Sequence, residues 1–370
     1  MPMLRHSPYH HQFTKLGAEF VERIGFAAPF KFTTVAEEHR ATRENVGLFD
    51  VYYQVPIEVA GAEAEAVLNQ LLVANIAKLP VGRVAYAAPC NAQGGMIDDL
   101  TCYRLADDRF WLVPTPSRVD AVLKAVLAQA TGRHVVVTPL GYKNAYLSVQ
   151  GPASRALLQG LTGTDLSGSA LAYFSLTTAT LADVPMTISR TGYSGELGFE
   201  LFYPSEYAEH VYTTLLSEGA AHGAKPCGLG ALRSLRIEKR YPLYGLDLDE
   251  TTTPVEAGLG WTVKLDKGEF QGRDVLARQK DGDLTRKLVL LLLEEGSELP
   301  AIGAEVHANG TAVGRVTSAD FGFTVGRPLA MAYVRPEIAK DGQAVSIAGA
   351  TSAAVSTRAA HDPDGHRVRS

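Results

Sequence analysis

The stretch AEVHANGTAVGRVTS, at residues 304–318, decides how the last part of the chain folds. Its Asn309-Gly310 pair separates two β-rich runs, and this dipeptide between such runs is a strong signal for a hairpin turn. Similar runs at residues 287–293 and 343–347 are linked by glycines and show little helical periodicity. The pattern predicts a separate β-barrel-like domain over residues 286–360.

The part of the chain before this domain mixes helical and strand patterns. Apolar residues recur at helical spacing over residues 13–24, 62–72 and 119–130. Short β-rich runs lie between them, at residues 55–59, 109–113, 135–138 and 145–149. Because the two patterns alternate irregularly, they favour an α+β fold over one doubly wound sheet. A chain of 370 residues is also too long for one ordinary core and suits two or three domains.

Composition excludes several classes of protein. The chain has 35 Lys and Arg against 40 Asp and Glu, with no basic stripe, which argues against a nucleic-acid partner. No apolar run approaches the roughly 18 residues that a membrane span needs. Its three cysteines (Cys90, Cys102 and Cys227) are far apart and odd in number, which favours reduced thiols and a cytoplasmic location. The polar residues after Ala360 are expected to form a frayed end.

The first candidate site is the stretch NAQGGMIDDLTCY at residues 91–103. Gly94-Gly95 predicts a tight turn, followed by a strand. Successive strand residues point to opposite faces, so Asp98 and Asp99 are not expected to enter one pocket together. On the residues alone, a hairpin with turn-stabilising aspartates is the commoner explanation.

The second candidate is RTGYSGELGFEL at residues 190–201. Its three glycines would let the backbone approach a ligand closely, and Tyr193 offers a ring with a hydroxyl group. Glu200 lies between apolar neighbours, and a carboxylate there needs a donor. A pterin edge presents two parallel N–H donors that a carboxylate can accept together, but a structural arginine would serve equally well.

The third candidate, GLGALRSLRIEKR at residues 228–240, lacks the third glycine of a dinucleotide fingerprint. It predicts a helix with a closely packed, glycine-rich start. Arg233, Arg236 and Arg240 would share one face, which could meet an anionic tail, although a solvated face paired with Glu238 is more common. The histidines show no complete metal site, and there is no Walker loop or G-x-S-x-G elbow, so neither a metal nor a serine nucleophile is expected.

Taken together, these segments resemble the glycine-cleavage T-protein (aminomethyltransferase) family, in order and over nearly the whole chain. The matching motifs are EHR (38–40), VGLFDV (46–51), AY (85–86), NAQGGMIDD (91–99), VQGP (149–152), RTGYSGELGFE (190–200), PCGLG (226–230), YGLDLDE (244–250), PVEAGLGW (254–261) and FQGR (270–273).

The resemblance implies three domains in a cloverleaf around a central folate channel, closed by a C-terminal β-barrel. The expected boundaries are residues 1–51 with 140–245 for a discontinuous folate-binding domain, 52–139 for an inserted domain, 246–285 for a connecting segment and 286–360 for the barrel.

The resemblance also implies roles for single residues. Asp99 matches the essential aspartate beside the folate nitrogens, where a carboxylate would stabilise the positive charge that develops during transfer. Tyr86, Tyr193 and Glu200 match residues that hold the pterin. The expected tetrahydrofolate-binding residues are Tyr86, Asp99, Tyr193, Glu200, Arg233 and Tyr241.

Several positions depart from the T-protein pattern. Ser-His-Met is replaced by Tyr52-Tyr53-Gln54, and the arginine that helps to hold folate is replaced by Leu232. Thr115 stands where T-proteins have an asparagine. The stretch LRSLRIEK at residues 232–239 is similar to the folate domains of dimethylglycine and sarcosine dehydrogenases and to folate-dependent demethylases. Tyr52, Tyr53, Gln54 and Thr115 are therefore expected to line a substrate pocket of a different kind.

The leading hypothesis is a tetrahydrofolate-dependent transferase that takes a methyl or methylene unit from a small N-, O- or S-methylated donor. The alternative is a T-protein that acts on a lipoyl carrier protein. A folate-binding iron–sulfur assembly factor is a third possibility, but the nearest stretch, residues 267–273, lacks the cysteine of that branch. A carrier protein or a separate flavin protein is a possible partner.

Overall fold

The computed structural model describes residues 3–348 and 351–370, and the chain divides into two compact units. The first comprises residues 1–55, 140–236 and 364–370, and the second comprises residues 56–139 and 237–363. Two of these breaks lie near the expected limits of the inserted domain. The expected division into domains and their cloverleaf arrangement stay predictions.

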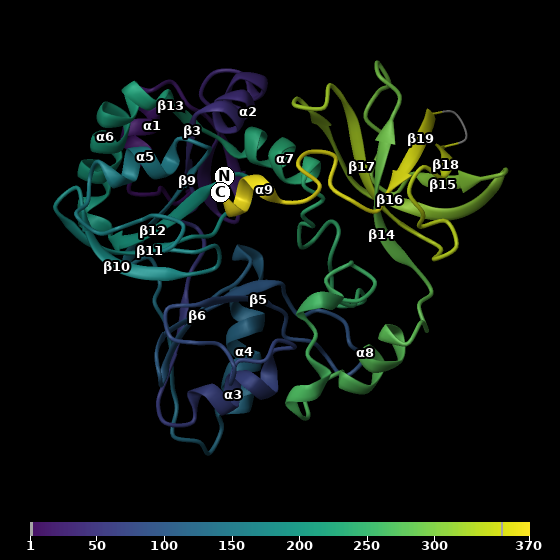
Figure 1. Ribbon diagram of the computed structural model, residues 1–370, viewed down its shortest axis with the longest axis horizontal. Helices are drawn as coiled ribbons and strands as arrows, with labels where there is room; N and C mark the ends of the chain where they lie inside the picture. Colours follow the sequence, from purple (N-terminus) through teal and green to yellow (C-terminus); the bar gives the residue numbers. More distant parts are fainter. Residues whose placement is uncertain (1–2, 349–350) are drawn as a thin grey trace. The chain divides into compact units, whose positions relative to one another are not determined.

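The first unit is built on a six-stranded sheet in the order β10-β11-β12-β9-β3-β13 (Figure 1). Its strands are β3 (Val46–Asp50), β9 (Asn144–Gln150), β10 (Leu176–Leu181), β11 (Val184–Ser189), β12 (Gly198–Pro204) and β13 (Ala224–Cys227). All neighbours are antiparallel except β3 and β13. The helices are α1 (His10–Lys15), α2 (Val35–Glu44), α5 (Ser154–Gln159), α6 (Ala208–Gly219), α9 (His366–Arg369) and, up to Arg236, α7 (Leu229–Glu238).

One apolar core joins this sheet to three of its helices. Phe13 of α1, Leu158 of α5 and Leu215 of α6 are buried together with strand residues such as Leu147 and Phe199. The long helix predicted over residues 13–24 is wrong in its second half. Gly17 adopts φ +78, which ends α1, and β1 (Glu19–Arg23) then pairs with β2 (Phe26–Lys31).

The second unit contains a five-stranded antiparallel sheet in the order β5-β6-β7-β4-β8. Its strands are β4 (Ile57–Ala60), β5 (Val84–Ala87), β6 (Leu100–Ala106), β7 (Arg109–Val113) and β8 (Val136–Pro139). Two helices, α3 (Ala64–Leu71) and α4 (Val119–Ala130), match the expected ranges and bury Leu68 and Val126 against the sheet. Residues 237–285, which include α8 (Arg273–Lys280), share a second apolar cluster with Cys90 and Met96.

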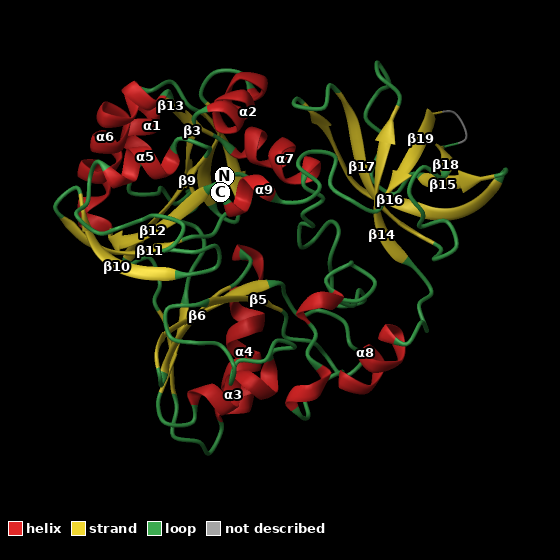
Figure 2. Cartoon of the chain, viewed as in Figure 1, coloured by secondary structure: helices red, strands yellow, loops and turns green. Residues whose placement is uncertain are grey.

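The rest of this unit is a closed six-stranded barrel, which confirms the α+β class and the predicted barrel domain (Figure 2). Its strands are β14 (Lys287–Leu293), β15 (Glu305–Ala308), β16 (Thr311–Gly322), β17 (Arg327–Val334), β18 (Ala344–Ile347) and β19 (Thr351–Ser356). The expected hairpin joins β15 to β16, and both Asn309 (φ +51) and Gly310 (φ +75) adopt the left-handed backbone that this turn requires.

The end of the chain differs from the expected frayed tail. Residues 366–369 form the short helix α9, and Val368 is buried. The polar composition did not predict this helix, because a single apolar side chain, Val368, packs against the rest of the unit. Arginine side chains form further contacts of the segment. No helix among the described residues is long and apolar enough to cross a membrane.

Candidate functional site

The turn at residues 91–95 is fixed by the side chain of Asn91. Its Oδ1 accepts hydrogen bonds from the backbone N–H groups of Gln93 (3.0 Å) and Gly95 (2.9 Å). Gly94 adopts φ +80, and a Cβ on Gly95 would lie 1.8 Å from the carbonyl oxygen of Glu250. Gly94 is therefore required by its left-handed backbone conformation, and Gly95 is required by the close approach of the Glu250 carbonyl.

Asp99 follows this turn and is held by Tyr86 on the neighbouring strand β5. The Tyr86 hydroxyl donates to Asp99 Oδ2 at 2.7 Å, whereas Oδ1 is shielded from water and has no hydrogen-bond partner among the described residues. Burial raises the pKa of Asp99 to about 6, the Tyr86 hydrogen bond lowers it, and the charge of Asp247 raises it. One oxygen is thus held in place while the other remains available to a ligand.

Asp98 has a different environment. Its side chain is fully buried, and its Oδ2 accepts a hydrogen bond from the backbone N–H of Thr115 at 2.8 Å. Burial, with the neighbouring charge of Asp99, raises the pKa of Asp98 well above its ordinary value. Asp98 Oδ2 thus has a backbone donor, whereas Asp99 Oδ2 has the Tyr86 hydroxyl as its donor. Asp98 holds the start of the segment at Thr115 through the backbone N–H of that residue.

Trp261 lies beside the candidate site residue Tyr86, and the sequence reasoning did not single it out. Its side chain is 59% exposed, and its ring stacks on that of Tyr86 with centroids 6.0 Å apart and an angle of 25° between the planes. An exposed tryptophan could have attracted attention, but the sequence does not reveal exposure. Tyr241, also expected to bind folate, is half-buried in the same unit.

In the first unit, the glycine-rich loop 190–197 joins β11 to β12 and is built around Gln150. A Cβ on Gly192 or on Gly198 would lie 2.1 Å from the side-chain oxygen of Gln150. The Ser194 hydroxyl donates to that oxygen at 2.7 Å, and the Gln150 amide donates to the carbonyl of Thr191 at 3.2 Å. The glycines thus make room for a protein side chain, in addition to any ligand.

Glu200 and Tyr193, the expected pterin residues, are both half-buried in this region. Glu200 lies in β12, opposite Ser189 of β11 and Ser148 of β9. The Thr191 hydroxyl donates to Glu200 Oε2. The donor that this carboxylate needs is thus partly supplied by a hydroxyl group.

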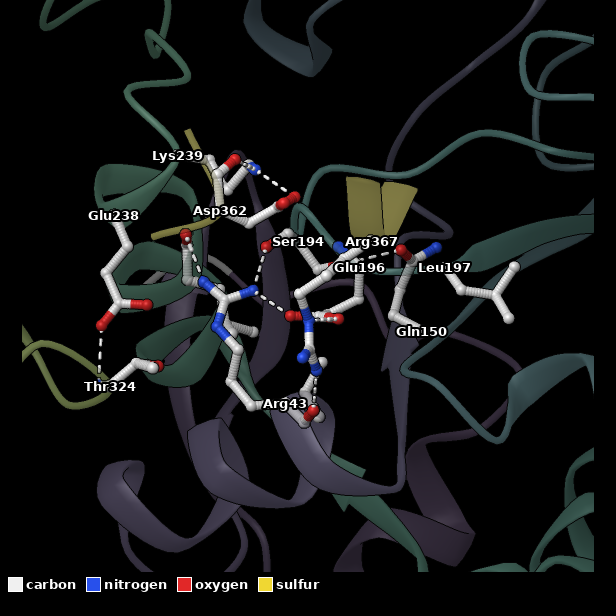
Figure 3. A network of polar contacts seen from close by, with 12 residues as sticks. Arg43, Gln150, Ser194, Glu196, Leu197, Glu238, Lys239, Thr324, Asp362 and Arg367 are labelled. Carbon is white, nitrogen blue, oxygen red and sulfur yellow. Dashed lines mark hydrogen bonds and ion pairs between the residues drawn. The ribbon is translucent and has the colours of Figure 1, made fainter. Parts of the chain in front are cut away.

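The same loop carries Glu196, whose buried carboxylate forms ion pairs with two arginines (Figure 3). Arg43 Nη1 lies 2.8 Å from Oε1, and Arg367 Nε lies 2.6 Å from Oε2. Sequence reasoning did not single out either arginine, because their contacts join residues 153 and 171 positions apart.

Comparison with known proteins agrees with this architecture. Residues 9–267 match the family model described as the GCVT N-terminal domain, and residues 286–361 match the glycine cleavage T-protein C-terminal barrel domain. The chain belongs to the glycine cleavage T-protein family. It is 38% identical over 344 residues to an aminomethyltransferase of Halothermothrix orenii, a match that covers 93% of this chain and 95% of the relative. It is 39% identical over 363 residues to an aminomethyltransferase of Streptomyces avermitilis, a match that covers 97% of this chain and 95% of the relative.

A solved T-protein structure is similar throughout. The crystal structure of glycine cleavage system aminomethyltransferase T from Bartonella henselae has a TM-score of 0.86 and 30% sequence identity, with 95% of this chain and 96% of that chain covered. Family membership confirms the predictions of a transferase and of tetrahydrofolate as its cofactor. The expected closeness to the demethylase branch is not confirmed, and the relatives favour the aminomethyltransferase alternative over the small methylated donor.

The residues that depart from the T-protein pattern lie in the first unit, apart from Thr115. Tyr53 is buried in an aromatic cluster with Phe26, and the half-buried Tyr52 donates to the carbonyl of Tyr142 at 2.9 Å. The backbone of Gln54 closes a turn onto Val51. These contacts give the two tyrosines structural roles, and their expected substrate contacts stay a prediction.

The predicted helix at residues 228–240 is α7, and its glycine-rich start packs as expected: a Cβ on Gly228 would lie 2.2 Å from the carbonyl oxygen of Phe30. The expectation of one exposed arginine face is wrong. Arg233 is exposed, but Arg236 is 98% buried, because α7 turns that side chain into the core. Arg240 is half-buried and donates to the carbonyl oxygen of Thr357, so Arg233 is the most exposed of the three candidates for an anionic ligand group.

Proposed function

We propose that this protein is an aminomethyltransferase that passes the one-carbon unit of an aminomethyl group, carried on the lipoyl arm of a carrier protein, to tetrahydrofolate. The observation that carries the proposal is Asp99, a carboxylate with one oxygen fixed by Tyr86 and the other without a hydrogen-bond partner among the residues that the structure describes. Its relatives of 35–39% identity over more than nine-tenths of the chain, all named aminomethyltransferase, support the same activity.

Each unit, taken by itself, has residues of the kind that a pterin needs. In the first unit, Glu200 has the acceptor atoms for an N–H beside an amino group. In the second unit, the Tyr86 and Trp261 rings offer flat apolar surface beside Asp99. Tetrahydrofolate, when bound, supplies the nitrogen nucleophiles that accept the one-carbon unit. Asp99 then stabilises the positive charge that develops beside it, and because its pKa is near 6 the group is mostly ionised at neutral pH.

The first test is a calorimetric titration of the purified protein with tetrahydrofolate, together with the Glu200→Ala and Asp99→Asn variants. The proposal expects micromolar binding that Glu200→Ala abolishes. Asp99→Asn should retain binding but lose roughly 10²–10⁴-fold in kcat, the usual contribution of a proton-handling or charge-stabilising group. Near-full turnover by Asp99→Asn would remove this residue from the mechanism.

A second candidate function, demethylation of a small methylated donor, rests on the departures at Tyr52, Tyr53, Gln54 and Leu232. The two functions differ in their donors. An aminomethylated carrier protein should support product formation under the first proposal, and small N-, O- or S-methylated compounds should not. The reverse pattern, read from the mass of the folate product, would replace the first proposal with the second.

A further inference from the structure

The carboxylate of Glu196 is held from two sides by segments that are distant in sequence (Figure 3). Only 1% of its side chain is exposed, and each of its two oxygens is paired with a different guanidinium group. Arg43 comes from helix α2, and Arg367 comes from the terminal helix α9. Glu196 therefore links the glycine-rich loop to both elements.

Arg43 supplies the inner half of this arrangement. It is also buried, and it donates to the carbonyl oxygens of Ser194 (2.8 Å) and Leu235 (3.2 Å) as well as to Glu196. Arg367 donates in addition to the carbonyl oxygen of Arg43. The two arginines thus form one connected network, in which Glu196 is the shared acceptor.

The segment 364–370 also contacts the other end of the same loop. Arg190, which is 1% exposed, donates to the carbonyl oxygens of Val368 (2.9 Å), Ser370 (2.8 Å) and Gly198 (3.3 Å). The side chain of Val368 is itself buried. The segment therefore contacts the loop at residue 190 and at residue 196, and Tyr193 lies between these two points in the sequence.

Burial decides what each arginine contributes. Removing one partner of a buried ion pair leaves a charged group without compensation and is strongly destabilising. Arg43 is in this position, with 4% of its side chain exposed, whereas 39% of the Arg367 side chain is exposed. Water can partly replace Arg367, so its loss should loosen the loop rather than unfold the unit.

We propose that residues 364–370 act as a clasp for loop 190–197, and that Arg367 is a positioning residue for tetrahydrofolate. By holding Glu196 Oε2, it fixes the loop that carries Tyr193 and leads into Glu200. This inference rests on the proposed function, because it assigns the clasp to the binding of the same ligand. The proposed role of Arg367 is exerted through Glu196.

The chain offers a matched control on the same helix. The Arg369 guanidinium donates to the carbonyl oxygens of Asp364 (2.7 Å) and Gly365 (3.0 Å), both within the clasp. Arg369→Ala therefore removes an arginine from α9 without removing a contact to the loop. Arg367→Lys keeps a cation beside Glu196 but loses the forked geometry of the guanidinium.

The decisive experiment measures hydrogen–deuterium exchange of the full chain without ligand. Arg367→Ala should speed exchange in the peptide that covers residues 190–200, Arg369→Ala should leave it unchanged, and Arg367→Lys should restore part of the protection. Equal exchange in this peptide for Arg367→Ala and Arg369→Ala would overturn the proposal.

Tetrahydrofolate binding then tests the functional half. Arg367→Ala should weaken Kd by about tenfold with a smaller change in kcat, since the residue orders a binding loop, and Arg367→Lys should recover part of the affinity. The thermal midpoint of Arg367→Ala should stay near that of Arg369→Ala. Normal affinity despite a loosened loop would overturn the positioning role. Failure of the unmodified protein to bind tetrahydrofolate would reject the proposed function instead, and the exchange result distinguishes this case.

Discussion

The hydroxyl group of Tyr86 lies 2.7 Å from Asp99 Oδ2 and donates to it from the neighbouring strand of the same sheet. This contact orients the carboxylate and favours its ionised form, which opposes the effect of burial on its pKa. The opposite oxygen has no partner in the part of the chain that the structure describes. Tyr86 thereby helps to determine both the orientation of the Asp99 carboxylate and the pH above which that group is ionised.

Tyr86→Phe should shift the acidic limb of the pH–kcat profile upwards. Removing the hydroxyl donor destabilises ionised Asp99, so its pKa rises above the present value of about 6. Because the proposed chemistry needs the carboxylate, activity at mildly acidic pH should fall more than activity at alkaline pH. The profile is measured at saturating tetrahydrofolate, so that a weaker KM does not enter. An unchanged limb, or one that moves to lower pH, would disprove the link between the two residues.

Asp98→Asn should be tolerated, and increasingly so as the pH rises. A buried carboxyl with a raised pKa binds a proton in the folded protein that the unfolded chain releases above about pH 4. Its contribution to stability is therefore complete below that value and is lost as the pH rises through the folded-state pKa. Asn keeps an acceptor for the Thr115 N–H and has no such dependence.

Urea unfolding at several pH values compares this variant with the unmodified protein and with Asp98→Ala. The Ala variant leaves the Thr115 N–H without an acceptor and should cost about 1–3 kcal/mol in the free energy of unfolding. If the stability difference between Asp98→Asn and the unmodified protein did not change with pH, Asp98 would not carry the buried proton.

Gly198→Ala should destabilise the first unit by roughly 1–3 kcal/mol, the usual cost of overpacking. The new methyl carbon would lie 2.1 Å from the side-chain oxygen of Gln150, which is fully buried and cannot move away without losing its bond to Ser194. Gly163→Ala is the control, because a Cβ there has no atom within 4 Å. Equal denaturation midpoints for the two variants would show that Gln150 can relocate.

Tryptophan fluorescence should report ligand binding through Trp261. The chain has two tryptophans, and Trp111 is buried whereas Trp261 is exposed against Tyr86. Addition of tetrahydrofolate should therefore change the emission of the unmodified protein and leave that of Trp261→Phe nearly unaltered. A full response from Trp261→Phe would place the ligand away from this ring.

Local patterns predicted the fold best where the sequence itself supplies the structural cause. The Asn309-Gly310 turn demands a left-handed backbone at both positions, and such a pair predicts its hairpin without knowledge of the rest of the chain. Helix α4 occupies its predicted range, residues 119–130, because its apolar residues recur at helical spacing over that whole range. The helix expected over residues 13–24 failed at Gly17, because apolar spacing alone did not register the break.

The candidate site was harder to predict. Motif resemblance predicted Tyr86, Asp99 and Glu200, whose hydrogen-bond partners lie within 13 residues of them, but it did not predict the contacts between distant segments. The Arg43–Glu196 pair spans 153 residues, and the stacking of Trp261 on Tyr86 depends on side-chain exposure that no local pattern encodes. Tertiary packing, rather than residue type, decides which charges are buried and which rings are accessible.

The position of Arg367, 171 residues after its partner Glu196, sets a constraint on biosynthesis. At about 5–20 residues per second, a ribosome that has just added Glu196 needs roughly 10–30 s more to reach Arg367. During that interval the nascent first unit has a carboxylate with one of its two guanidinium partners not yet made, while the whole barrel is still being translated. The first unit is therefore completed only after the barrel has been translated, and a chain released before residue 367 would carry a barrel but an unfinished glycine-rich loop.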